Sequence, residues 1–298
     1  MPAVTHITPD DLTTPGIFSS FERIVLAQGD SWFSIGAIPP FATSNLIFGM
    51  ELNRDTCVVV CARPGATLVN MVDWMQSDAF GRQLSGRLAT RWNAIFISGG
   101  GNDLINAIQS PATTANGPVP RDRRLLLTPQ ERGPDPQPTA AGYVSEPGWQ
   151  TFCAHLTHHF TDLVARREKG PNQGVPLFFH TYDYLVPRNA PAFPGFGPWL
   201  FKAMTEFQIP QAQWSDLGKE FIDRLATLLE NIIAKINSDF GRDMGLFLVN
   251  TRGTLAPPAA GSTGASGDWT NEIHPTSAGY RKLAAVWRSV VDPVIGLR

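Results

Sequence analysis

Short apolar runs separated by longer amphipathic stretches organise this chain. Five runs rich in β-branched and aromatic residues lie at residues 24–27, 57–62, 94–98, 176–180 and 246–250. They do not alternate strictly between apolar and polar positions, so they predict strands buried on both faces, as in a parallel sheet.

The stretches between these runs predict helices at about residues 66–90, 149–169 and 215–240. In the third stretch, Phe221, Leu225, Leu229 and Ile232 recur at steps of three and four residues, which is the pattern of an amphipathic helix. A last helix is expected at 275–291, with Pro275 in its first turn. Alternation of strands and helices over the whole length predicts a doubly wound α/β domain.

Two segments interrupt this alternation. Residues 110–148 are rich in Pro, Gly and Arg, and this segment is too long for a simple connection. Residues 186–210 carry few charges and several aromatic residues, namely Phe193, Phe196, Trp199, Phe201 and Phe207. Both segments can be surface decoration of the domain. For the second, we favour a wall or lid over an apolar ligand.

Composition narrows the class of protein. The 298 residues include 24 Lys and Arg against 26 Asp and Glu, and the near-neutral balance argues against a nucleic-acid partner. With 43% hydrophobic and 17% charged residues the chain can form a packed core. Cys57, Cys61 and Cys153 are too few for a disulfide framework.

Targeting signals are not apparent in the sequence. No apolar stretch approaches the roughly 18 to 20 residues of a membrane span, so no transmembrane segment is predicted. The first residues lack the basic and apolar regions of a signal peptide. The default expectation is a cytoplasmic protein, with export by a non-classical route left open.

Polar residues and glycines follow the predicted strands. Ser31 comes after the first, Gly65 after the second, Asn102 after the third and Asp183 after the fourth, and His274 lies about twenty residues beyond the fifth. In a parallel sheet, ligands collect at the carboxyl ends of the strands. A hydroxyl, an amide and an imidazole at that edge can supply a nucleophile, an oxyanion donor and a base for acyl transfer.

These motifs resemble those of the SGNH, or GDSL-type, hydrolases. The resemblance covers about residues 24–290 and rests on Gly-Asp-Ser at 29–31, the glycine at 65, Gly-x-Asn-Asp at 100–103 and His-Pro at 274–275. It does not include the two long segments. The resemblance implies one three-layer αβα domain over residues 1–298, built on a flavodoxin-like five-stranded parallel sheet with 110–148 and 186–210 as insertions.

The resemblance also implies roles for individual residues. Ser31 would be the nucleophile and His274 the general base. The backbone N–H groups of Ser31 and Gly65 and the side-chain amide of Asn102 would form the oxyanion hole. Gly65 can alternatively be a plain turn residue, and Asn102 can be a helix cap. The expected enzyme is an esterase or lipase that needs no cofactor and no metal ion.

One position departs from the family pattern. The family has Asp three residues before the histidine, whereas this chain has Asn271. In a serine protease the change from acid to amide costs about 10⁴ in rate, chiefly through the wrong imidazole tautomer. An Asn whose oxygen faces the ring would avoid that penalty. We therefore expect Asn271 to orient His274, with Asp268, Glu272 or Asp183 as a possible acid.

The predicted function is hydrolysis of a small-molecule or lipid carboxylic ester through an acyl-enzyme. An acyltransferase on the same scaffold and a non-catalytic binding protein derived from it are the alternatives. The choice between hydrolysis and transfer, the natural substrate and the oligomeric state stay open at this point. His155 and His159 could share a helix face, but no acidic partner accompanies them, so no metal site is predicted.

Overall fold

A parallel sheet forms the centre of the molecule. The computed structural model describes residues 2–34, 44–73, 78–87, 89–132, 139–192 and 195–296. The sheet has six strands in the order β1-β3-β2-β4-β7-β8, and each neighbouring pair is parallel. Their bounds are β1 Thr5–Ile7, β2 Arg23–Gly29, β3 Thr56–Val60, β4 Ala94–Ser98, β7 Leu177–His180 and β8 Leu246–Val249.

The predicted fold class is confirmed. The five strands expected from the sequence are present, and in chain order their arrangement reads 2-1-3-4-5, the flavodoxin-like order. The sixth strand, β1, was not predicted. It has three residues, two of them exposed, and it pairs with Cys57–Val59 at the sheet edge. Its sequence carries no apolar run because only one side of it meets the core.

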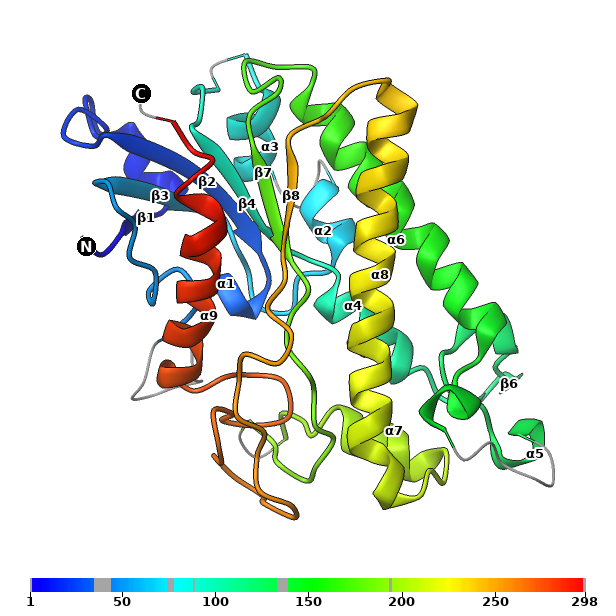
Figure 1. The fold of residues 1–298 in the computed structure, drawn as a ribbon. Coiled ribbons are helices and arrows are strands. Elements are labelled where there is room, and N and C mark those ends of the chain that lie inside the picture. The colour runs from blue at the N-terminus through cyan, green and yellow to red at the C-terminus, as the bar shows by residue number, and fades with distance from the viewer. Residues whose placement is uncertain are drawn as a thin grey trace.

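Helices cover both faces of the sheet. In Figure 1, α6 and α8 run side by side on one side of the sheet, while α9 lies on the other. The α-helices are α1 Ser31–Ser34, α2 Leu68–Val72, α3 Asp78–Ser85, α4 Gly101–Ile108, α5 Pro129–Arg132, α6 Glu146–Arg167, α7 Leu200–Glu206, α8 Trp214–Phe240 and α9 Ser277–Val291. None of the helices in the described ranges is long and apolar enough to cross a membrane.

The core explains why the strand ends are held firmly. Every residue of β2 and β4 is buried, as expected for central strands. Phe96 contacts Phe178 and Trp287 edge-to-face, with ring centroids 5.7 and 5.3 Å apart, which joins the sheet to α9. Close packing of this kind fixes the positions of the residues that follow the strands.

The first insertion, residues 110–148, is packed against the domain. It contains the β5–β6 hairpin (Thr113–Thr114 and Gly117–Pro118), the short 3₁₀ helices η2 (Arg121–Arg123) and η3 (Ala140–Tyr143), and α5. The Arg124 side chain is buried and pairs with Glu131. A Cβ on Gly148 would lie 1.9 Å from the Arg124 carbonyl oxygen, so this segment touches α6 directly. Its residues 133–138 lie outside the described ranges.

The second insertion, residues 186–210, contains α7 and lies beside the loop that carries His274. Phe207 is buried, Trp199 is partly buried and Phe196 is 54% exposed. Phe193 lies outside the described residues. The aromatic residues of this segment therefore include both packing and surface positions.

Candidate active site

Ser31 is the first residue of α1 and is separated from the end of β2 by Asp30 alone. Asp30 prepares this turn because its carboxylate Oδ1 accepts a hydrogen bond of 2.9 Å from the backbone N–H of Trp32. The Ser31 Oγ lies 2.9 Å from Nε2 of His274, which is 243 residues further along the chain. Both residues are buried, with exposed fractions of 9% and 3%. The fold thus brings together the nucleophile and the base predicted from the sequence.

The His274 imidazole is neutral at physiological pH. Burial lowers the pKa of His274 to about 4, because charging the ring would place a cation in a poorly solvated site. A neutral ring can accept a proton only if the nitrogen that faces Ser31 is free of hydrogen. The tautomer of the ring therefore decides whether it can act as a base.

Asn271 sets that tautomer. Its Oδ1 accepts hydrogen bonds from the backbone N–H groups of Ile273 and His274, at 3.0 and 2.9 Å. The amide nitrogen is therefore left to face the ring, where Nδ2 lies 3.1 Å from Nδ1 of His274. Since an amide nitrogen only donates, Nδ1 accepts and the ring proton resides on Nε2. The arrangement that would avoid the tautomer penalty, with the Asn271 oxygen facing the ring, is therefore absent, whereas Asn271 does contact the ring as expected of an orienting residue.

This orientation of Asn271 makes Ser31 an acceptor in the resting site. His274 Nε2–H donates to Ser31 Oγ, whereas general-base catalysis needs the reverse. Turning the amide over would aim its NH₂ at the two backbone donors and lose both hydrogen bonds. The backbone of the 271–274 loop therefore holds the imidazole in the unproductive tautomer.

The three candidate acids have other partners. Asp268 accepts from the Ala256 N–H and from Lys282. Asp183 accepts from the backbone N–H groups of residues 184, 253 and 255, which closes the loop after β8. Within the described ranges, neither carboxylate is hydrogen-bonded to His274. Burial alone would raise the pKa of Asp268, but Lys282 brings it below its usual range.

Glu272 is also occupied by backbone groups. Its carboxylate accepts N–H hydrogen bonds from Arg188 and, at the start of α7, from Trp199, Leu200 and Phe201. Burial raises the pKa of Glu272 to about 7 in spite of these donors. Its role is to fasten the 186–210 insertion to the histidine loop. That contact also brings the Trp199 ring to 5.7 Å from the His274 ring.

The two further oxyanion candidates lie in different cavities. Asn102, in the first turn of α4, lines a narrow cavity together with Ser31. Its Nδ2 donates to the Ala66 carbonyl at 3.1 Å, and the second N–H of that amide remains for a substrate. Gly65 has a φ of +72°, which favours glycine, and lines the neighbouring pocket instead. The Asn102–Ala66 hydrogen bond connects the wall of the Ser31 cavity with the loop that carries Gly65.

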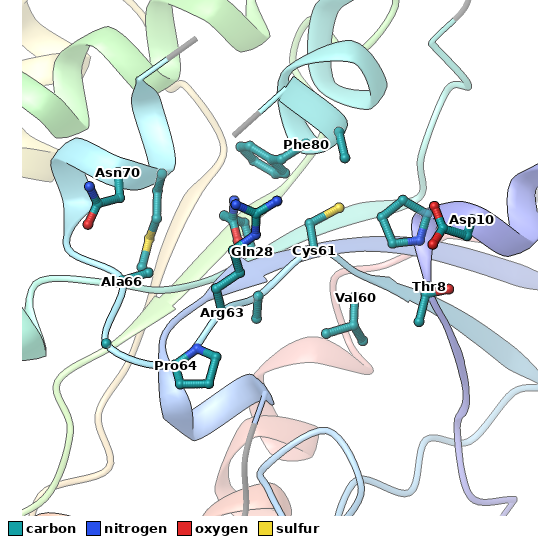
Figure 2. A pocket seen from close by; sticks show the side chains of 15 residues that line it. Thr8, Asp10, Gln28, Val60, Cys61, Arg63, Pro64, Ala66, Asn70 and Phe80 are labelled. Atoms are coloured by element: carbon teal, nitrogen blue, oxygen red, sulfur yellow. The ribbon is translucent and has the colours of Figure 1, made fainter. Parts of the chain in front are cut away.

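Figure 2 shows the pocket that Gly65 borders, at the carboxyl end of β3. Its volume is about 430 Å³. Arg63 extends over Gln28 towards Phe80, with the Cys61 thiol beside them. By contrast, the cavity at Ser31 measures only about 20 Å³ and is walled mainly by apolar side chains, namely Trp32, Leu104, Ile105, Leu185, Ile222 and Ile273.

A second polar network lies beneath the nucleophile, and sequence reasoning missed it. Ser98 Oγ donates to Asp30 Oδ1 at 2.8 Å and lies 3.0 Å from Nε2 of His180. Tyr182 Oη donates to Asp30 Oδ2 at 2.6 Å. Serine, histidine and aspartate here resemble a catalytic triad in composition. The only hint in the sequence was that His180 and Tyr182 follow a strand.

The connectivity of this network differs from that of a hydrolytic triad. Ser98 stands between the acid and the histidine, whereas a triad places the histidine in the middle. Ser98 has no exposed surface. Burial lowers the pKa of His180 to about 3 and raises the pKa of Asp30 to about 6. Ser31, which lines a cavity, is the serine placed to meet a substrate.

No metal-binding cluster of three His, Cys, Asp or Glu side chains occurs among the residues that the structure describes. The Asp103 carboxylate connects the start of α2 with α6. Its Oδ2 accepts from the Leu68 N–H at 2.8 Å, and its Oδ1 lies 3.2 Å from Nε2 of His155. This pairing places His155, on α6, against the residue that follows Asn102 in the first turn of α4.

Comparisons with known proteins give distant structural similarities. No protein-family model matches the sequence. No curated protein matches it either. An extracellular lipase from Streptomyces rimosus is similar over 90% of this chain and 100% of its own, with 15% identity and a TM-score of 0.48. Phospholipase A1 from Streptomyces albidoflavus is similar over 91% of this chain and 100% of its own, with 13% identity and a TM-score of 0.45.

A variant of an acetyl-xylooligosaccharide esterase from Geobacillus stearothermophilus is similar over 90% of this chain and 93% of its own, with 14% identity and a TM-score of 0.47. The solved structures that are similar over about 90% of the chain are thus those of lipases and esterases.

Proposed function

We propose that this protein is a serine hydrolase that cleaves carboxylic esters through an acyl-enzyme on Ser31. The observation that carries the proposal is the 2.9 Å contact between Ser31 Oγ and His274 Nε2 at the carboxyl edge of the sheet. In the reaction, Ser31 Oγ attacks the ester carbonyl carbon while His274 takes the hydroxyl proton. The proton then passes to the departing alcohol, and water releases the acid in a second round.

The oxyanion of the tetrahedral intermediate would be stabilised by the Ser31 backbone N–H and the Asn102 amide. Asn102 lines the same cavity as Ser31 and has an N–H beyond the one given to Ala66. Gly65 lines the neighbouring pocket, and we assign its backbone N–H the role of third donor because the Asn102–Ala66 hydrogen bond ties its loop to Asn102. Removing one such donor typically costs about 10²–10³ in kcat.

The substrate we propose is an ester with a short acyl group. The cavity beside Ser31 has a volume of about 20 Å³ and mainly apolar walls, so it has room for a group about as large as one water molecule. The larger pocket of Figure 2, which borders Gly65, is assigned to the alcohol part of the ester. Arg63, Gln28 and Asn70 would give it polar contacts there.

Asn271 makes this enzyme a slow one. Before each attack the ring must exchange the Nε2–H tautomer for the Nδ1–H form, which places the new proton against the Asn271 amide nitrogen. The same observation favours one competing function, a binding protein that has kept the scaffold without turnover. The two functions differ in whether Ser31 reacts.

The test measures reactivity of Ser31 directly. A fluorophosphonate probe and p-nitrophenyl acetate are given to the wild type and to Ser31→Ala, His274→Ala and Ser289→Ala. We expect labelling and turnover in the wild type and in the exposed control at Ser289, and loss of both in Ser31→Ala. A wild type that neither labels nor hydrolyses, or a Ser31→Ala variant with full turnover, would contradict the proposal.

A further inference from the structure

Tyr182 adopts an unusual backbone conformation two residues after the end of β7. Its φ is +61°, in the left-handed region that a bulky side chain seldom occupies. The residue is buried, with an exposed fraction of 4%. Such conformations persist only where the surrounding contacts enforce them, and they are enriched at functional sites.

The Tyr182 hydroxyl holds the residue that precedes the nucleophile. Tyr182 Oη donates to Asp30 Oδ2 at 2.6 Å. The other carboxylate oxygen of Asp30 accepts from the Trp32 N–H and from Ser98 Oγ, at 2.9 and 2.8 Å. Asp30 is thereby fixed on both of its oxygens. Ser31 lies between the two backbone positions that this carboxylate controls.

The ring of Tyr182 also rests on the residue that precedes Asn102. A Cβ added to Gly101 would lie 2.6 Å from the ring carbon Cζ and 2.9 Å from the hydroxyl oxygen. The Tyr182 ring therefore lies against the Gly101 backbone, at the start of α4. Ser31, Asn102, Gly101 and Tyr182 all line the same cavity.

We propose that Tyr182 is a positioning residue that fixes the spacing between the Ser31 hydroxyl and the Asn102 amide. It does so by joining the turn after β2, through Asp30, to the turn after β4, through Gly101. This proposal rests on the proposed function, since it assigns Tyr182 to the geometry of that same site. A misplacement of about 1 Å between reacting groups is enough to cost about 10²-fold in rate.

The experiment compares Tyr182→Phe with Tyr184→Phe. Tyr184 is a matched control, because its hydroxyl also donates to a carboxylate, that of Asp223 at 3.0 Å, on α8. Values of kcat and KM for p-nitrophenyl acetate are measured over a range of pH, and thermal unfolding checks that each variant is folded. We expect kcat to fall about 10- to 100-fold in Tyr182→Phe, with KM within about twofold of the wild type. Tyr184→Phe keeps the wild-type values.

The pH profile separates positioning from general packing. Burial raises the pKa of Asp30 and the Tyr182 hydrogen bond lowers it, so losing the hydroxyl raises this pKa further. Ionised Asp30 accepts from the Trp32 N–H, so the part of the acid limb of kcat that reports Asp30, which lies above the part set by His274, moves to higher pH in Tyr182→Phe alone. A folded Tyr182→Phe enzyme with wild-type kcat and an unmoved acid limb overturns the proposal.

A second variant, Gly101→Ala, changes the contact between the Tyr182 ring and the Gly101 backbone from the side of Gly101. If Tyr182→Phe does not fold, Gly101→Ala displaces the ring by its added methyl group, and kcat should again fall with KM retained. Full kcat in folded Gly101→Ala overturns the role of Tyr182. Ser31→Ala is measured in parallel. A wild type without activity on the ester overturns the proposed function and this role together, whereas an active wild type with unaffected Tyr182 variants overturns only this role.

Discussion

Replacing Asn271 by Asp should turn a slow site into a faster one. The Asp carboxylate keeps one oxygen on the Ile273 and His274 N–H groups, where Asn271 Oδ1 accepts at 3.0 and 2.9 Å. Its second oxygen takes the place of the amide nitrogen, 3.1 Å from Nδ1 of His274. An acceptor at that point requires Nδ1–H, so Nε2 becomes free to take the Ser31 proton.

The size of the gain follows from the cost of the wrong tautomer. In a serine protease the reverse change, from Asp to Asn, lowers kcat by about 10⁴, or about 5.5 kcal/mol of activation free energy. Part of that cost comes from the charge that stabilises imidazolium, and Asn271→Asp supplies the charge as well. We expect kcat for p-nitrophenyl acetate to rise between about 10²- and 10⁴-fold, with KM little changed.

The pH profile gives an independent readout of the Asn271→Asp variant. Burial holds the pKa of His274 at about 4, so in the wild type the neutral ring persists down to that pH. A carboxylate beside Nδ1 favours the imidazolium and raises this pKa, which moves the acid limb of the rate upwards. Asn231→Asp, an exposed change of the same charge on α8, should leave rate and profile unaltered.

If folded Asn271→Asp has the wild-type kcat and an unmoved acid limb, while Ser31→Ala is inactive, the tautomer does not limit the rate. Asp268→Asn and Asp183→Asn should both leave kcat unchanged where they fold, since their carboxylates bind other groups. A large loss of kcat in either one would identify it as the acid instead.

Three further changes test other parts of the structure. Asn102→Ala should lower kcat for p-nitrophenyl acetate about 10²–10³-fold, and an unaltered kcat would remove it from the oxyanion hole. Burial raises the pKa of Glu272 from 4.5 to about 7. Between these two pH values the folded state binds more protons than the unfolded state, so Glu272 makes the unfolding free energy fall as pH rises. In Glu272→Gln the slope of the unfolding free energy against pH should therefore become more positive, by up to about 1.36 kcal/mol per pH unit in urea titrations, and an unchanged slope would count against the shift. Gly148→Ala should destabilise the fold by about 1–3 kcal/mol, because its methyl group meets the Arg124 carbonyl, while Gly264→Ala, with open space around it, should match the wild type in the same titrations.

The scaffold could be predicted because its signals are local. The run at 94–98 coincides with β4, and the expected helices at 215–240 and 275–291 differ from α8 and α9 by one or two residues at their first turn. These elements bury a face of their own sequence, so apolar spacing reveals them. By contrast, the described residues of the stretch at 66–90 form two helices, and the first ends at Val72 with Asp73 as its C-cap.

The finer points of the site depend on partners far away in the sequence or on backbone atoms. The side-chain type of Asn271 shows that a charge is missing, but which end of its amide meets the ring is decided by two backbone donors. The positioning role proposed for Tyr182 depends on its hydrogen bond to Asp30, which lies 152 residues earlier in the sequence. Neither the orientation of the Asn271 amide nor the Tyr182–Asp30 hydrogen bond produces a residue spacing that can be recognised in a single sequence.

The carboxylate of Glu272 has a consequence for how this protein can change over evolutionary time. Four backbone N–H groups of the 186–210 segment donate to the Glu272 side chain, which belongs to the same 271–274 loop as Asn271 and His274. Length or sequence changes in that segment are tolerated only if they still present amides to the same anion. A graft of this segment from another protein should therefore be transplanted together with residues 271–274, since these hydrogen bonds join the two segments.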